Sequence, residues 1–143
     1  MTVYATDRIY VFRLGPGAEI LKALTAHCAK HNIQQSVIQG IGTLRDPVIG
    51  SYDFEDQEYR RLELPGIWEL LTLNANSSLK EGTPFIHAHA TLGDAKGHCR
   101  GGHLFSAEVL VAEVTVHALA GRPLERYTDP ETGLSLWPTK DQV

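Results

Sequence analysis

The chain has 143 residues, of which 43% are hydrophobic, and a net charge of −4 with its histidines neutral. This length and composition predict one globular domain over residues 1–143, with enough apolar side chains for a core. They exclude a membrane-spanning helix, because there is no apolar run of about 18 residues, and the acidic balance argues against direct DNA binding, which needs a surplus of Lys and Arg.

The first part of the chain predicts a strand, a helix and a second strand. Residues 8–14 are rich in Ile, Tyr, Val and Phe, and a Gly-Pro-Gly turn ends this strand. Apolar residues recur at helical spacing through residues 18–30, with Glu19 in the first turn, where its charge suits the helix dipole. Residues 36–41 again have the composition of a strand, which a Gly-Ile-Gly turn closes.

Further strands follow in the middle of the chain. Residues 48–52 and 58–62 are predicted as an antiparallel pair around an acidic turn. Residues 67–73 form a strongly apolar strand that Glu69 interrupts, and residues 74–82 are predicted as a polar loop.

The last part of the chain completes the predicted sheet. Residues 109–119 predict a long strand rich in β-branched residues, and residues 123–143 predict a short strand and an irregular tail. The patterns add up to one main helix and roughly seven to nine strands. We therefore expect an α+β fold, in which a strongly bent mixed, mainly antiparallel sheet, or half-barrel, carries one helix packed on it.

Three histidines carry the strongest functional signal. His87 and His89 are two residues apart in a run of strand formers, so both rings point to one face of a strand. His103 follows a Gly-rich connection and supplies a third nitrogen if the next strand pairs with the first. Gly101 and Gly102, just before it, permit a tight backbone approach. Three histidines and an open position are typical of catalytic zinc sites, although an isolated His-x-His also occurs on surface strands without a metal.

Four residues outside this group have more than one interpretation each. Glu69 and Glu113 can act as a fourth ligand, as a neighbour of the ligands, or as the general base of an enzyme, and Glu113 equally fits a cross-strand partner of an arginine. Arg126 and Asp129 are interpreted as a structural anchor for the following Thr-Gly-Leu segment, with a subunit-interface pair as the alternative. No catalytic residue is assigned from the sequence.

The other histidines are predicted to lie outside the site. His27 and His31 stand four apart near a helix end and are interpreted as solvated positions rather than metal ligands. His98, next to Cys99, is expected in an exposed loop, because adjacent residues seldom face the same way. His117 lies at the far end of its strand.

Several motifs together resemble the PPC domain family (plants and prokaryotes conserved). The core of the resemblance is IHAHATLGD, GHCRGGHL and AEVTVHAL, in this order. The family's opening strand, turn and helix resemble RIYVFRLGPGAEILKAL of this chain. Its next strands resemble QSVIQGIGTLRDPVIGSYD and GIWELLTLN. The C-terminal segment of the family resembles RYTDPETGLSLW. Two departures are residues 74–76 and 106–108, where the family pattern usually has a glycine.

The resemblance implies a half-barrel fold, assembly as a homotrimer and zinc on His87, His89 and His103. Members of this stand-alone kind are described as regulatory or DNA-binding proteins. Plant relatives join the domain to separate AT-hooks that bind DNA, and this chain has no such hook.

Two functions follow as expectations. The first is a trimeric, zinc-binding module of the PPC family with a regulatory or DNA-associated role. The alternative is a metal-dependent enzyme or small-molecule sensor, in which the open coordination position binds a small anionic ligand. Other divalent transition metals also accept imidazole ligands. Since no signal peptide or disulfide framework is visible, we expect a cytoplasmic protein.

Overall fold

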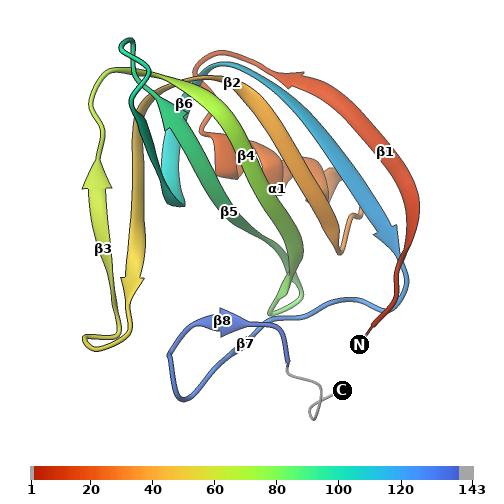
Figure 1. Cartoon of the computed structure of the whole chain (residues 1–143). Helices are drawn as coiled ribbons and strands as arrows, with labels where there is room; N and C mark the ends of the chain where they lie inside the picture. The colour runs from red at the N-terminus through yellow and green to blue at the C-terminus, as the bar shows by residue number, and fades with distance from the viewer. Residues whose placement is uncertain (1, 139–143) are drawn as a thin grey trace.

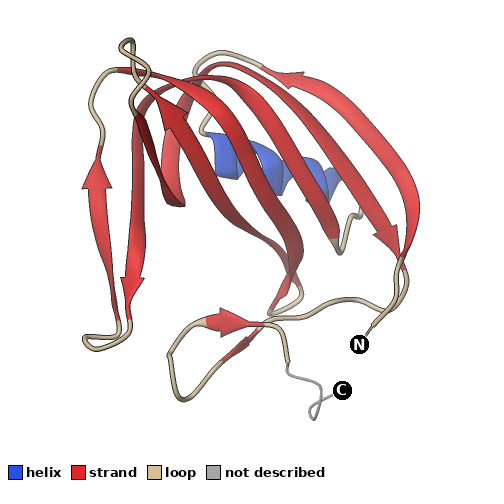
Figure 2. Ribbon diagram, viewed as in Figure 1, coloured by secondary structure: helices blue, strands red, loops and turns tan. Residues whose placement is uncertain are grey.

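The computed structural model describes residues 2–138, so residues 139–143 of the predicted tail lie outside the described part. A strongly curved sheet carries a helix on one face, and a small two-stranded hairpin lies beyond one end of it (Figures 1 and 2). The elements in chain order are β1 (Ala5–Leu14), α1 (Ile20–Lys30), β2 (Ser36–Asp53), β3 (Glu58–Glu63), β4 (Ile67–Lys80), β5 (Thr83–Gly93), β6 (Cys99–Ala120), β7 (Tyr127–Thr128) and β8 (Ser135–Leu136).

The large sheet has the strand order β1-β6-β5-β4-β2-β3, and its ladders run antiparallel. β2 and β6 have 18 and 22 residues, so each changes neighbours along its length. The start of β6 pairs with β5 and its end pairs with β1, while β2 runs beside both halves. This additional pairing bends the sheet into a half-barrel. The predicted α+β fold with one main helix is confirmed.

Helix α1 covers one face of the sheet with an apolar stripe. Ile20, Leu24 and Cys28 recur every four residues and are fully buried in the core. The helix begins two residues later than predicted, because Glu19 is its N-cap and not part of the first turn. The Glu19 carboxylate accepts hydrogen bonds from two backbone N–H groups at the start of the helix. Within residues 2–138, no helix has the length and apolar character needed to cross a membrane.

Two predicted strand boundaries are wrong, and in both places polar or glycine residues continue a strand. The strands expected at residues 36–41 and 48–52 are one strand, β2, with bulges in its pairing to β6. Residues 74–80 of the loop expected at 74–82 are instead the second half of β4, and only residues 81–82 form a turn. Its polar side chains find partners there, as when the hydroxyls of Ser77 and Ser36 hydrogen-bond at 2.7 Å in the core.

Gly102 marks a close approach of β6 to β2. A Cβ at this position would lie 2.5 Å from the carbonyl oxygen of Gly50, which confirms the tight packing predicted for this glycine pair. We expect Gly102→Ala to lower the free energy of unfolding by about 2–3 kcal/mol, because the two strands must move apart. Urea unfolding measures this change.

The matched control is Gly15→Ala, since nothing lies within 4 Å of a Cβ placed at Gly15. That variant should change the free energy of unfolding by less than about 0.5 kcal/mol. Equal urea midpoints for Gly102→Ala and the wild type would show that the contact between β6 and β2 does not constrain the fold.

Candidate metal centre

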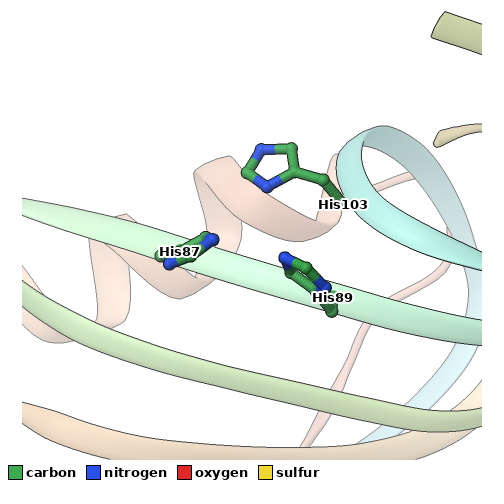
Figure 3. A group of neighbouring side chains, drawn as sticks. All are labelled: His87, His89 and His103. Atoms are coloured by element: carbon green, nitrogen blue, oxygen red, sulfur yellow. The ribbon is translucent and has the colours of Figure 1, made fainter. Parts of the chain in front are cut away.

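Strand β5 presents His87 and His89 on one face of the sheet. Their neighbours Ala88 and Ala90 are buried in the core, at 1% and 3% exposure, so the two histidines point to the face opposite α1 (Figure 3). This is the orientation that the spacing of the two histidines predicted.

A tight turn brings His103 to the same face. The Asp94 carboxylate accepts hydrogen bonds from the backbone N–H groups of Lys96 and His98, and Gly97 has a positive φ of 81°. The chain reverses here, and β6 pairs with β5 so that His103 lies directly opposite His89. Directly opposed residues point to the same face of a sheet, so the third imidazole joins the other two.

The three imidazoles form a compact triangle, seen in Figure 3. Their ring centroids are 5.2 Å apart for His87 and His89, 5.2 Å for His87 and His103, and 5.5 Å for His89 and His103. One nitrogen from each ring lies within 4.8 Å of the others. Nitrogens around a tetrahedral zinc with bonds of about 2.0–2.1 Å are roughly 3.4 Å apart, a spacing that small rotations of the rings can reach.

Burial favours the neutral form of His103 and His87. It lowers the pKa of His103 to about 4, with further contributions from His87, His89 and Arg61. It also lowers the pKa of His87, together with the charges of Arg126 and His89. The His103 Nδ1 atom is buried and has no hydrogen-bond partner among the described residues. A neutral imidazole and an unpartnered nitrogen are what coordination requires, so this donor set fits a divalent transition metal.

The two glutamates considered as further ligands lie elsewhere. Glu69 is five residues before Asn74, the β4 partner of His89, which is roughly 16 Å along the strand. Its carboxylate accepts a hydrogen bond of 3.3 Å from the Thr43 hydroxyl. Glu113 lies opposite Arg13 of β1, the register that a cross-strand pair requires. Among residues 2–138, the group of converging ligand atoms contains the three histidines alone.

The other histidines are not part of the triangle. His98 is exposed in the turn, as predicted, and its ring hydrogen-bonds the Asp94 carboxylate at 3.0 Å. His117 is near the far end of β6, opposite Ile9. His27 corrects the prediction of a solvated position, because its ring stacks on Phe12 with centroids 4.2 Å apart.

The anchor predicted near the tail is present. Arg126 is 6% exposed and donates a hydrogen bond of 2.9 Å to the carbonyl oxygen of Ser135. The Asp129 carboxylate accepts hydrogen bonds from the backbone N–H groups of Glu131 and Thr132. Both residues therefore hold the C-terminal segment, in line with the structural interpretation.

Two aromatic rings pack beside His103, and the sequence did not predict them. The rings of Tyr59 and Phe105 lie 4.9 Å and 4.8 Å from the His103 ring, centroid to centroid. Tyr59 comes from β3, which reaches this place only through its pairing with β2. No local pattern around Tyr59 indicates this neighbour.

The chain has clear relatives. The Plants and Prokaryotes Conserved (PCC) domain model matches residues 1–120. A plant- and prokaryote-conserved (PPC) protein from Pyrococcus horikoshii is 41% identical, with a TM-score of 0.94 over 97% of this chain and 96% of its own. A metal-containing protein from Archaeoglobus fulgidus is 39% identical, with a TM-score of 0.90 over 97% of this chain and 100% of its own.

A third solved structure is more distant. A protein from Ralstonia eutropha JMP134, described as a candidate DNA-binding protein, is 27% identical and has a TM-score of 0.83 over 95% of both chains. No curated protein matches the chain significantly. The family model covers most of the sequence, and the two archaeal structures superpose over nearly their full length. The resemblance seen in the sequence motifs is thus confirmed, and the chain belongs to the Plants and Prokaryotes Conserved (PCC, or PPC) domain family.

Proposed function

We propose that this protein is a metal-binding module that holds zinc on His87, His89 and His103. The observation that carries the proposal is the convergence of three imidazole nitrogens within 4.8 Å, with the Nδ1 of His103 buried and unpartnered. The Archaeoglobus fulgidus relative, 39% identical, is named a metal-containing protein, which supports the same reading. Three histidine ligands are typical of zinc sites, and imidazole also binds iron, nickel and copper.

Three protein ligands leave one coordination position open. A zinc ion held this way lowers the pKa of a bound water toward ~7 and polarises oxygen ligands. An enzyme would also need a base beside the metal, and the two candidates, Glu69 and Glu113, belong to other parts of the sheet. The arrangement therefore favours a binding or sensing module over a hydrolase.

A regulatory role, acting through assembly and partners in the cytoplasm, completes the proposal. The net charge of −4 offers few cations for phosphates, so we infer that any association with DNA is indirect. The Ralstonia eutropha relative, which is 27% identical and described as a candidate DNA-binding protein, supports a DNA-associated role.

Metal content tests the metal site. The protein purified without an affinity tag should carry about one metal per chain by elemental analysis. An X-ray fluorescence scan identifies the element, and we expect zinc. A content below about 0.1 per chain after supply of zinc would contradict the proposal.

We expect a homotrimer, with a mass by light scattering of about 47 kDa, three times the chain mass of 15.8 kDa. Strand β1 is an edge of the sheet, and Ile9 and Val11 on it are 56% and 75% exposed. An exposed apolar edge is a typical subunit contact. Val11→Glu should therefore yield a smaller species.

The matched control is Lys96→Glu in the exposed turn between β5 and β6, which should leave the mass unchanged. A wild-type mass near 15.8 kDa at micromolar concentration would contradict the trimer.

A further inference from the structure

One row of residues crosses five strands on the histidine face. The successive partners are Arg61 on β3, Gly50 on β2, His103 on β6, His89 on β5 and Asn74 on β4. Residues paired in this way point to one face, and Gly50 has no side chain to separate Arg61 from His103. The Arg61 side chain is therefore directed to the β3 side of the triangle.

Contacts confirm where the Arg61 guanidinium lies. Its central carbon is 4.3 Å from the centroid of Phe105, and the Phe105 ring is 4.8 Å from that of His103. The positive charge of Arg61 also contributes to the lowered pKa of His103. Arg61 makes no ion pair with any described acidic residue.

A second arginine flanks the triangle on the β4 side. Asn76 lies directly opposite His87, and its amide oxygen accepts a hydrogen bond of 2.6 Å from Arg126 Nη2. Arg126 also donates to the Ser78 hydroxyl at 2.8 Å, in addition to its bond to Ser135. A guanidinium has five N–H donors, so these three bonds leave two of them free.

Arg126 is a buried cation without an acidic partner among the described residues. Its side chain is 6% exposed, and it takes part in none of the ion pairs among residues 2–138. Its charge contributes to the lowered pKa of His87. Burying a charge without a counterion is costly, so a negative group at this place would be stabilised.

The two arginines that flank the triangle, Arg61 and Arg126, are both positive. Three neutral imidazoles leave a divalent metal with its full charge, and two guanidiniums stand on either side. The group of converging ligands contains no carboxylate. A neutral water would leave all of this charge uncompensated, whereas an oxyanion on the metal would be attracted by both arginines.

A cavity on the same face offers room for the rest of a ligand. Val37, Asn76 and His87 are successive partners across β2, β4 and β5, so they share the histidine face. Val37 and Asn76 line a cavity of about 980 Å³, together with Leu124, Leu136 and Trp137. This volume is in the range of small-molecule sites, and the lining is largely apolar.

We propose that the open metal position binds the carboxylate of a small organic acid, which the positive charges of Arg126 and Arg61 stabilise, and that the cavity beside Asn76 holds its apolar body. This inference rests on the proposed metal site. Guanidinium attracts carboxylate and phosphate alike, and the apolar side chains that line the cavity favour an organic acid over inorganic phosphate.

The test uses the full chain loaded with Co²⁺, whose visible absorption reports on the ligands of the metal. Titration with benzoate, acetate and inorganic phosphate gives three dissociation constants, and imidazole serves as a neutral metal ligand. We expect Arg126→Gln to weaken benzoate binding about tenfold or more. The more exposed Arg61 should contribute less, about threefold in Arg61→Gln. Neither variant should change the affinity for imidazole or the metal content.

Arg60→Gln is the matched control, because it removes the same charge from the neighbouring position of β3. Arg60 points to the other face and binds Asp53 and Asp56, so benzoate binding should stay at the wild-type value. Arg126→Lys keeps the positive charge but lacks the planar guanidinium with its paired N–H donors. It replaces Arg126→Gln in the titrations if that variant does not fold. The exposed Arg61→Gln tests the inference independently of either.

The outcomes separate the two proposals. A chain that takes up no metal contradicts the proposed function, and with it this inference. Metal uptake with benzoate binding unchanged in both arginine variants overturns the inference alone, as does an equal loss for imidazole. If phosphate bound more tightly than benzoate and acetate, the site would be assigned to phosphate groups, and the proposal of an organic acid ligand would be wrong.

Discussion

His103→Ala is expected to lose its metal, with an affinity lowered by more than about a hundredfold. Changing a residue that only orients a ligand already costs about 10–100-fold, and His103 is itself a proposed ligand. The variant keeps only His87 and His89, and no described acidic side chain joins them. Competition with a chromophoric chelator measures the affinity, and elemental analysis measures the metal that remains after purification.

Three single variants serve as controls for this result. His98→Ala, His31→Ala and His27→Ala should keep the wild-type metal content, because none of these rings belongs to the triangle. His98 is the closest match in sequence, since it lies five residues before His103. Full metal content in His103→Ala would mean that the His-x-His pair is completed by another residue.

The histidine triangle was predictable because each step depends on local sequence. Alternation along a strand places His87 and His89 on one face, and alanines between and after them show which face is buried. The Gly-Asp turn then predicts a hairpin, and the hairpin register puts His103 opposite His89. The helix was equally clear, since its apolar residues recur at a single period.

The surroundings of the triangle were not predictable from local sequence. Residues 74–80 are polar enough for a loop, and only their pairing with both β2 and β5 makes them a strand. That pairing gives Asn76 its place opposite His87, and a segment 50 residues further along the chain then delivers Arg126 to Asn76. Arg61 likewise reaches the site through the register of three strands. Contacts this distant in sequence leave no periodicity to detect.

The distance of Glu69 and Glu113 from the histidines was equally hidden from local sequence. Each lies in an apolar strand, where a charged residue suggests a nearby positive centre. In the structure, both line a separate cavity with Ile41 and Val111, and none of the three histidines lines it. Their carboxylates are suitable metal ligands by type, but they lie too far along the strands to reach the histidines.

Acid is expected to release the metal at a lower pH than from an ordinary three-histidine site. The sequence alone predicts weakening near ~6.5, where free imidazoles take up protons. In the structure, the pKa of His103 is about 4 and that of His87 is lowered, both chiefly through burial. Protons therefore compete for these two nitrogens only in more acidic solution.

The size of this shift can be measured. Between pH 7.5 and 5.5, three ordinary imidazoles would together lower the affinity about a thousandfold. Without the contribution of His103, the loss should stay below about a hundredfold, and it should steepen as pH falls toward 4. Chelator competition over a series of pH values tests this, and a thousandfold loss already at pH 5.5 would contradict the buried, neutral state of His103.

The metal-free protein should stay folded, because its core does not involve the metal, but it should lose stability as pH falls from about 6.5 toward 4. His103 titrates near ~6.5 in the unfolded chain and at about 4 in the folded one, so the unfolded chain takes up the proton first. This contribution is complete above about 6.5 and disappears as pH falls toward 4. The shift corresponds to at most about 3–4 kcal/mol, and to about 1–2 kcal/mol after solvent screening at this half-buried ring. In urea unfolding, metal-free His103→Asn should therefore show a flatter pH dependence than the wild type, and His98→Ala should keep the wild-type slope. An unchanged slope in His103→Asn would assign the pH dependence to another group.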